Sequence, residues 1–257
     1  MKIEEKIKQK YLYSKNFNFI KIIYFFIQFF KSKFKYKKSY SFGSQDLITE
    51  KFFKNKKKGI YLDVGCFHPV IGNNTYKLYK KGWEGINIDI DFHSIDLFNF
   101  FRKNDENIQI GVSDKSGEND MFFFHNRSAI NTLNPIRGKN AKEVKKIKID
   151  TLNNVIKKTK FANSKIDFLT IDVEGYEMNV LKGFDIKKYS PDLIVIEFMD
   201  LENKTDDIYK IEFYKQNLNK ILNSELYNYM IHNNYSLVNW TFLDLVWVSN
   251  KFKQINS

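Results

Sequence analysis

The 257-residue sequence contains a single cysteine, Cys66. One cysteine forms no disulfide bond within the chain and cannot supply several thiolate ligands, which excludes a disulfide-stapled scaffold and a structural zinc site built from cysteines. A chain without disulfide bonds is typical of a reducing compartment, and we expect a cytoplasmic protein.

Long apolar runs are also absent. A membrane-spanning helix needs about 20 apolar residues, and the most hydrophobic stretch, residues 18–30, is shorter and is interrupted by Lys21 and Gln28. A lysine-rich segment, residues 31–38, follows directly, where a signal peptide would have the small residues of its cleavage site. The sequence therefore predicts neither a spanning helix nor a removable signal peptide in this region.

Most of the chain lacks an excess of positive charge. The formal net charge is +12, but residues 1–59 contain 16 lysines and 4 acidic residues, whereas residues 60–257 contain 26 basic and 26 acidic residues. The balanced body is unlike the strongly basic surface that nucleic-acid binding requires. We therefore expect no nucleic-acid partner.

The positive charge lies in residues 1–40, a basic and aromatic-rich segment that we predict to be helical and distinct from a domain covering residues 41–257. Its apolar residues fall on nearly every side of a helical wheel, which suits two alternatives. The segment packs on the domain as a helix surrounded by solvated lysines, or it lies in the interface of an anionic membrane, at the inner face.

Strand and helix patterns alternate from residue 59 onward. Hydrophobic residues make up 43% of the sequence and aromatic residues 17%, which is enough for a sizeable core. Short apolar runs predict strands at 59–65, 85–91, 108–112, 167–172 and 192–198. Helical patterning predicts helices at 74–81, 95–101, 151–158 and 176–181. This alternation indicates an α/β fold with a doubly wound parallel sheet covered by helices on both faces.

Two regions depart from the alternation. Between residues 115 and 150, turn residues precede two apolar runs at 121–125 and 146–150, and no helix fits between the runs, which predicts an antiparallel insertion. Near the C-terminus, an amphipathic stretch at 209–230 is followed by runs at 236–242 and 243–248. These last runs are too close together for a crossover helix, so we expect an antiparallel hairpin at one sheet edge.

Acidic and small polar residues follow each predicted strand of the parallel sheet. They are Asp63 and Gly65, Asp89 and Asp91, Ser113 and Asp114, Asp172 and Glu174, and Glu197. Ligands of a doubly wound sheet bind beyond the carboxyl ends of its strands, and so many acids there favour cations and hydroxyl groups over phosphate. The loop at 63–69 also lacks the Gly-x-Gly-x-x-Gly pattern of dinucleotide sites, and the sequence has no P-loop.

Asp89 stands at the end of the second predicted strand, where a carboxylate accepts hydrogen bonds from both hydroxyls of a ribose. Together with the preference for cations, this position predicts a nucleoside that has a positive centre and no phosphate. S-adenosylmethionine, a sulfonium nucleoside, meets both requirements.

Two longer motifs extend this prediction to a family. The first motif comprises Asp63-Val64-Gly65, Asn74-Thr75 and Gly82-Trp83-Glu84-Gly85-Ile86-Asn87-Ile88-Asp89. The second motif runs from Ile166 to Glu177 and continues with Val180-Leu181-Lys182-Gly183. A shorter stretch, Ser44-Gln45-Asp46, precedes both motifs. In these motifs the sequence resembles the FkbM-type S-adenosylmethionine-dependent methyltransferases over residues 41–250. The resemblance implies a seven-stranded class I methyltransferase (Rossmann-like) sheet with an antiparallel last strand. It also implies O-methylation, often of sugars or other secondary metabolites.

The resemblance implies a set of cofactor-binding residues. Asp63 and Gly65 match the cofactor loop, Asn74 and Thr75 the helix that follows it, Asp89 the ribose-binding acid, and Ser113 and Asp114 the segment near the adenine. Asp89 stands where the family usually has glutamate, a longer acid. Phe67-His68-Pro69 departs from the smaller residues and glycine that are common in the family.

Methyl transfer requires that the acceptor oxygen lie in line behind the methyl carbon and that a base remove the hydroxyl proton. The candidate catalytic residues are Asp172, Glu174, Glu197 and His68. Alternatively, carboxylates from adjacent strands hold Mg²⁺, which lowers the pKa of the acceptor without a protein base. Helix capping is the structural interpretation of Asp63, Asp89 and Glu174.

The predicted function is S-adenosylmethionine-dependent O-methylation of a hydroxyl on a sugar, glycan or glycolipid. A nucleic-acid methyltransferase is one alternative, but its adenine- or cytosine-modifying members have an Asn/Asp-Pro-Pro-aromatic motif where this chain has Asp172-Val173-Glu174-Gly175. A non-catalytic module that binds S-adenosylmethionine is the other. The expected partners are a carbohydrate or glycolipid substrate and, through residues 1–40, a membrane surface.

Overall fold

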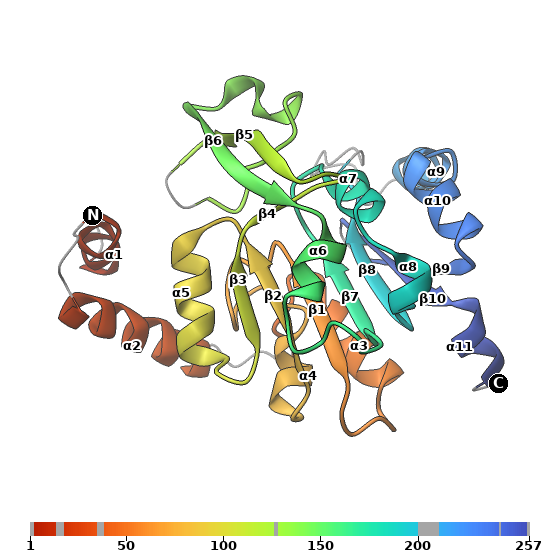
Figure 1. Cartoon of the computed structure of the whole chain (residues 1–257), viewed down its shortest axis with the longest axis horizontal. Helices are drawn as coiled ribbons and strands as arrows, with labels where there is room; N and C mark the ends of the chain where they lie inside the picture. The colour runs from red at the N-terminus through yellow and green to blue at the C-terminus, as the bar shows by residue number, and fades with distance from the viewer. Residues whose placement is uncertain are drawn as a thin grey trace.

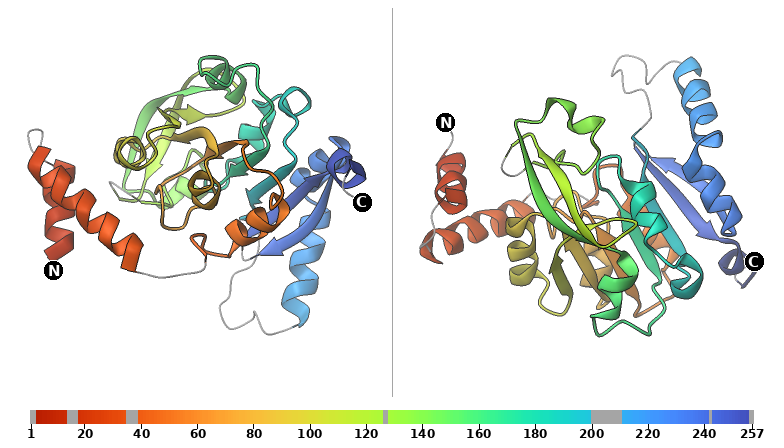
Figure 2. Two further views of the ribbon diagram at one scale, coloured as in Figure 1. Left: turned by 90° about the horizontal axis from the view of Figure 1, so that it is seen from below. Right: turned by 45° about the horizontal axis from the view of Figure 1, so that its top comes forward.

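The computed structural model describes residues 3–13, 18–34, 39–125, 128–199, 211–241 and 243–255. A large central sheet has helices on both faces, and a smaller sheet lies beside it (Figure 1). The described ends of the chain lie at opposite sides of the molecule in every view (Figures 1 and 2).

The central sheet has seven strands in the order β3-β2-β1-β7-β8-β10-β9. They are β1 (Ile60–Val64), β2 (Glu84–Asp89), β3 (Glu106–Gln109), β7 (Phe168–Ile171), β8 (Leu193–Glu197), β9 (Tyr235–Thr241) and β10 (Asp244–Ser249). Pairing is parallel from β3 to β8, and β10 is antiparallel to both of its neighbours, β8 and β9. The predicted doubly wound sheet with an antiparallel last strand is therefore confirmed.

The strands bury side chains on both faces of the sheet because successive residues point in opposite directions. Tyr61 belongs to a core cluster under α3 (Gln45–Phe52), α4 (Tyr76–Lys80) and α11 (Asn250–Ile255). Leu62 belongs to a larger cluster on the other face. That cluster lies under α6 (Leu152–Lys157), α7 (Glu177–Lys182), α8 (Ile186–Tyr189), α9 (Ile211–Leu222) and α10 (Glu225–His232). The apolar strands predicted a sheet with two buried faces, and the structure confirms it.

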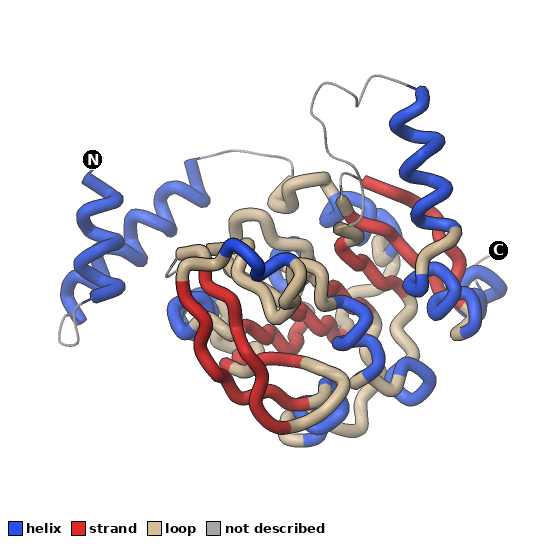
Figure 3. The backbone as a smooth tube through the Cα atoms, turned by 90° about the horizontal axis from the view of Figure 1, so that it is seen from above, coloured by secondary structure: helices blue, strands red, loops and turns tan. Residues whose placement is uncertain are grey.

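The smaller sheet is the predicted insertion. It comprises β4 (Gly111–Val112), β5 (Gly117–Phe123) and β6 (Glu143–Asp150) in the order β4-β6-β5, with a short 3₁₀ helix, η1 (Arg137–Asn140), in the connection. β5 and β6 pair antiparallel, as predicted. Figure 3, viewed from above, shows these strands in front of the central sheet.

The prediction of one continuous strand at 108–112 was wrong. The main sheet keeps only β3, which ends at Gln109, and the chain then turns to β4, which pairs parallel with the end of β6. The backbone N–H of Ile110 still donates to the carbonyl of Asp89 at 3.0 Å, and that of Ser113 donates to Asp150 at 3.0 Å. The apolar run is therefore shared between two sheets, each of which satisfies part of its backbone.

The predicted amphipathic stretch at 209–230 contains two helices in its described part. Ser224 separates α9 from α10, and its hydroxyl oxygen accepts a hydrogen bond from the N–H of Tyr227 at 3.0 Å. This side chain caps α10, because it satisfies a donor that the first turn of the helix leaves unpaired. Residues 209–210 lie outside the described residues, and α8 had not been predicted.

Two helices, α1 (Ile3–Tyr13) and α2 (Asn18–Phe34), lie at the N-terminal side of the molecule against α5 (Phe92–Phe101) (Figures 1 and 2). The hydroxyl of Tyr11 donates to Asp96 at 2.8 Å, and Lys21 forms an ion pair with the same carboxylate at 2.6 Å. Packing on the domain, one of the two alternatives for this segment, is therefore present. The domain boundary at residue 40 stays a prediction. Among the described helices, none is long and apolar enough to cross a membrane.

Candidate active site

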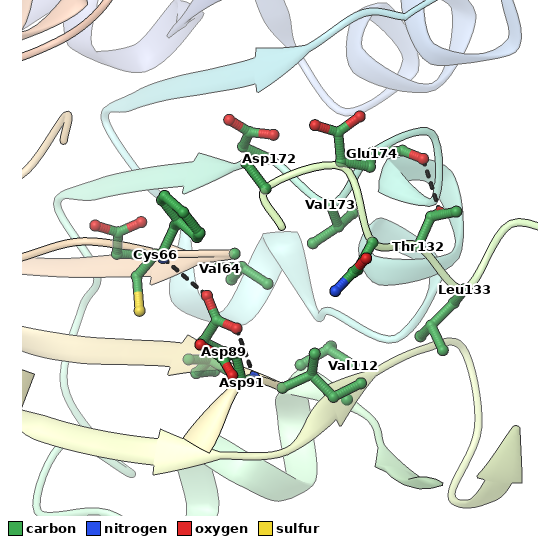
Figure 4. Close-up of a pocket in the computed structure, with 18 of the residues that line it drawn as sticks. Val64, Cys66, Asp89, Asp91, Val112, Thr132, Leu133, Asp172, Val173 and Glu174 are labelled. Carbon is green, nitrogen blue, oxygen red and sulfur yellow. Dashed lines mark hydrogen bonds between the residues drawn. The ribbon is translucent and has the colours of Figure 1, made fainter. Parts of the chain in front are cut away.

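The carboxyl ends of β1, β2 and β7 border a cavity that the insertion partly covers (Figure 4). The cavity contains about 1130 Å³ of space, including open solvent at its mouth. Five of the described residues that line it are acidic, namely Asp63, Asp89, Asp91, Asp172 and Glu174, and none of them is basic. This lining favours a cationic or hydroxyl-rich ligand and disfavours a phosphate.

The loop after β1 turns sharply at Gly65, which has φ +80°. A Cβ atom at this position would lie 1.7 Å from the backbone oxygen of Asp172, so the loop packs directly against the end of β7. The side chain of Asp63 is buried beneath the loop and accepts hydrogen bonds from Asn73 at 3.0 Å and Thr75 at 2.9 Å. Burial raises the pKa of Asp63 to about 6, against the lowering effect of Arg102.

Arg102, at the end of α5, is fully buried and donates hydrogen bonds to the loop that follows β1. Its guanidinium donates to the carbonyl of Pro69 at 2.7 Å, to Asn73 at 2.6 Å and to Thr75 at 3.0 Å. A buried charge requires such partners because it has lost its hydration. The two residues that hold Asp63 are thus themselves held by Arg102.

Asp89 faces the cavity from the end of β2 (Figure 4). One carboxylate oxygen accepts a hydrogen bond from the N–H of Phe67 at 2.8 Å, and the other accepts one from the N–H of Asp91 at 2.7 Å. A carboxylate oxygen can accept two hydrogen bonds, so these two contacts leave the side chain of Asp89 able to accept a further bond from a ribose hydroxyl. Asp63 and Asp89 therefore share one cavity, as their positions at neighbouring strand ends predicted.

Asp172 and Glu174 project from the end of β7 on the side of the cavity opposite Asp89 (Figure 4). Asp172 is accessible to solvent from the cavity, whereas Glu197, at the end of β8, is buried behind it. Burial of the region raises the pKa of Asp172, and burial together with the Asp172 charge raises the pKa of Glu197 well above the usual range of glutamate. At neutral pH Glu197 is therefore protonated, and one of its carboxyl oxygens lies within 4.8 Å of an oxygen of Asp172.

Glu174 has φ +59°, an uncommon conformation for a residue other than glycine. Its carboxylate pairs with Arg137 of η1 at 2.8 Å, and its carbonyl accepts a hydrogen bond from Thr132 at 2.8 Å, so the insertion holds it in place. Glu177 supports the same loop by accepting from the N–H groups of Val173 at 3.2 Å and Gly175 at 3.0 Å. Burial and the nearby Asp172 raise the pKa of Glu174 to about 7.

Residues 63–235 match the methyltransferase FkbM domain, and this range begins at Asp63 and covers more than half of the chain. The chain belongs to the FkbM methyltransferase domain family. No curated protein matches the chain. The predicted family membership is confirmed, and with it the assignment of this protein as a methyltransferase.

In this FkbM methyltransferase, six of the eleven predicted site residues line the cavity: Asp63, Gly65, Asn74, Asp89, Asp172 and Glu174. Five others are not among the lining residues: His68, Thr75, Ser113, Asp114 and Glu197. Ser113 is buried and donates to Asp114, while the lining at this point consists of Ile110, Gly111 and Val112. The predicted roles of Ser113 and Asp114 near an adenine stay predictions.

His68 is buried in the turn of the cofactor loop. Its Nδ1 accepts hydrogen bonds from the N–H groups of Val70 at 3.1 Å and Ile71 at 3.0 Å. A nitrogen that accepts these bonds is unprotonated, so the neutral ring has its proton on Nε2. This bonding assigns His68 a part in shaping the loop, and its catalytic role stays a prediction.

Sequence reasoning missed Asp244 at the start of β10. This residue is paired in register with Glu197 and is hydrogen-bonded to Gln45 of α3, so the Ser44-Gln45-Asp46 stretch contacts the acidic end of the sheet. Burial and the nearby Asp172 raise the pKa of Asp244 to about 7. The register of β10 against β8 brings Asp244 beside Glu197, and the sequence pattern does not determine that register.

The family implies S-adenosylmethionine as the methyl donor, and the donor set of the cavity fits it. Asp89, the acid expected at the ribose, lines the cavity, and Ile110, Val112, Met121 and Leu133 add apolar side chains that suit an adenine. The acidic lining described above suits a sulfonium, because opposite charges attract strongly where water is partly excluded.

We expect Asp89→Ala to weaken the binding of S-adenosylmethionine roughly 5- to 150-fold, which corresponds to about 1–3 kcal/mol for the loss of a charged hydrogen-bond partner. Calorimetry on the purified protein measures the change. Glu106→Ala is the matched control, because this acid lies on β3 outside the cavity lining. An affinity that falls equally in both variants would contradict the ribose assignment.

Proposed function

We propose that this methyltransferase transfers the methyl group of S-adenosylmethionine to a hydroxyl group of a sugar, glycan or glycolipid. The observation that supports the proposal most strongly is the position of Asp172, an accessible carboxylate in the cavity wall that is backed by a buried partner, Glu197. A hydroxyl acceptor needs a base at this place, because its oxygen becomes a good nucleophile only as its proton leaves.

S-adenosylmethionine supplies an activated methyl group whose leaving group needs no acid. The residues of the chain have three tasks around it. Asp89 and the loop at Gly65 orient the nucleoside, and the acidic lining as a whole attracts the sulfonium. Asp172 then accepts the acceptor's proton, and the buried Glu197 lies behind it, with a carboxyl oxygen within 4.8 Å of the Asp172 carboxylate. Alignment of this kind contributes up to about 7–11 kcal/mol to a bimolecular reaction.

The cavity mouth supports a carbohydrate as the acceptor. Asn74, Ser128 and Asn131 offer amide and hydroxyl groups there. The ring of Phe42, which is 80% exposed, adds an apolar surface at the same mouth. A sugar presents both hydroxyl groups and apolar C–H faces, so this mixed rim suits it. The absence of basic residues from the described lining argues against a nucleic-acid acceptor, whose phosphates need such residues.

The three acids Asp172, Glu174 and Glu197 are also the candidate Mg²⁺ site, since one oxygen of each lies within 4.8 Å of the others. The surrounding residues do not fit this ion. The guanidinium of Arg137 already neutralises Glu174 at 2.8 Å, so one of the three acids is paired with a cation of the chain itself. We therefore propose a reaction that uses a protein base.

Removal of divalent cations tests this choice. We expect methyl transfer by the purified enzyme to be unchanged after treatment with EDTA, and added Mg²⁺ to have no stimulating effect. Because the proton goes to a carboxylate in this account, no metal is needed to lower the pKa of the acceptor. Loss of activity with EDTA and its recovery with Mg²⁺ would assign the three acids to a metal instead.

The acceptor class is tested by mass spectrometry of cell-surface glycans from cells with and without the gene. The proposal expects a glycan that is heavier by one methylene group only where the gene is present. A parallel assay supplies the purified protein with S-adenosylmethionine labelled in its methyl group and offers it glycan extract or RNA. Label in RNA but not in glycan would support the nucleic-acid alternative, and cofactor binding without transfer to either would support the non-catalytic module.

A further inference from the structure

Helix α2 has apolar side chains on two opposite sides. One side faces the domain, where Tyr24 and Phe25 pack with Leu97 of α5. Lys21, which pairs with Asp96, and the buried Gln28 lie on the same side. The other side faces solvent and consists of Phe19, Ile22, Phe26 and Phe30, with exposed fractions of 71%, 46%, 52% and 50%. These four residues, spaced three or four positions apart, form one line along the helix, which we call the outer face of α2.

The outer face is unusual for a helix that already packs on a protein. The solvent-facing side of such a helix normally carries charged or polar residues. Here a shallow groove along α2 is instead lined by Ile23, Phe26, Ile27, Phe30 and Lys31. A contiguous exposed apolar surface of this kind marks a binding surface.

The charge of the surrounding sequence identifies the kind of partner. Between Lys6 and Gln45 the chain has ten lysines and no acidic residue. Lys6 and Lys10 are exposed on α1, and Lys31 lies at the end of the groove. The partner must therefore offer negative charge beside an apolar layer. A second copy of this chain fits poorly, because it would bring ten further lysines to the same contact.

We propose that the outer face of α2 binds the surface of an anionic phospholipid bilayer. The aromatic and isoleucine side chains enter the boundary between headgroups and acyl chains, and the lysines contact anionic headgroups. At about 1.5 Å per residue, the 17 residues of α2 lie along the interface and do not cross the membrane. This arrangement agrees with the finding that no described helix could span a bilayer.

Helix α2 and the cavity both adjoin α5. Lys21 of α2 pairs with Asp96 in the middle of α5, and Tyr11 of α1 packs on His93 with ring centroids 5.0 Å apart. Asp91, which lines the cavity, caps the same end of α5 by accepting from the N–H of Ser94 at 3.1 Å. The docking surface and the cavity are therefore connected by one helix.

Vesicle flotation with the full-length protein tests the proposal. The vesicles are phosphatidylcholine alone or an equimolar mixture with phosphatidylglycerol. We expect the protein to float with the anionic vesicles and to be released as salt screens the lysines. We expect Phe26→Glu/Phe30→Glu to reduce the partitioning at least about tenfold, because two charges would enter the apolar layer. Leu218→Glu is the matched control, an exposed apolar residue on α9 that should leave flotation unchanged.

Two further measurements separate the possible outcomes. Thermal unfolding of the double variant should match that of the wild type, because both phenylalanines are already half exposed. Absence of flotation with anionic vesicles, or equal flotation of the wild type and the double variant, would overturn the proposal. Sedimentation that shows a dimer of the wild type and a monomer of the double variant would also overturn it, since a second copy would then occupy the outer face. S-adenosylmethionine binding is independent of all these results.

Discussion

Asp172→Asn is expected to lower kcat for methyl transfer about 10²–10⁴-fold, the usual contribution of a general base, while the affinity for S-adenosylmethionine changes little. Asparagine keeps the size of the side chain and its place in the cavity wall, but it does not accept a proton. A methyl-transfer assay gives kcat, and calorimetry gives the affinity. The loss of kcat without loss of binding distinguishes a base from a residue that only holds the cofactor.

The pH dependence and one control accompany this result. Because the surrounding protein removes part of the water around its carboxylate, the pKa of Asp172 is raised from its ordinary value. The wild-type rate should therefore fall as the pH drops through this raised pKa, because the carboxylate takes up a proton. Asp120→Asn removes an exposed carboxylate from β5, outside the cavity lining, and should leave kcat unchanged. Retention of more than a tenth of the wild-type kcat in Asp172→Asn would assign the base elsewhere, with Glu174 as the next candidate.

Gly65→Ala is expected to abolish measurable binding of S-adenosylmethionine. A Cβ at this position would lie 1.7 Å from the backbone oxygen of Asp172, so the cofactor loop and the end of β7 would have to move apart. The positive φ of +80° adds a backbone penalty of about 1 kcal/mol for a residue other than glycine. Calorimetry measures the binding, and circular dichroism shows whether the variant stays folded.

Gly82→Ala is a control with the same backbone penalty and no clash. Gly82 has φ +86°, and a Cβ there would meet no atom within 4 Å. It precedes β2 at the end of the strand remote from the cavity. We expect this variant to bind S-adenosylmethionine normally and to unfold a few degrees lower, as about 1 kcal/mol predicts for a domain of this size. Normal binding of S-adenosylmethionine by Gly65→Ala would contradict this expectation, because it would show that the loop accommodates a Cβ atom at position 65.

The central sheet and the shared cavity were predictable because they follow from local patterns. In β1, β2, β7 and β8 a short apolar run ends at or next to an acid, and parallel strands place their carboxyl ends at one edge. This rule alone brings Asp63, Asp89 and Asp172 together. Gly65 could be recognised in the same way, since a glycine after the first strand is needed where two backbones approach closely.

Contacts that depend on tertiary pairing could not be predicted in this way. The run at 108–112 has apolar residues at alternate positions, as a single strand would, and only the presence of β6 explains why the chain leaves the main sheet after Gln109. Asp244 reaches Glu197 through the register of an antiparallel pair. Arg102 stands beside a lysine in the sequence and resembles an ordinary surface cation, yet it is fully buried beneath the cofactor loop.

Calorimetric titration of the wild-type protein with S-adenosylmethionine tests the central claim, that the acid-lined cavity between β2 and β7 receives this sulfonium nucleoside. We predict one binding site per chain, weakened in Asp89→Ala and lost in Gly65→Ala. A wild-type protein that releases or absorbs no heat at millimolar cofactor, while folded by circular dichroism, would contradict the claim.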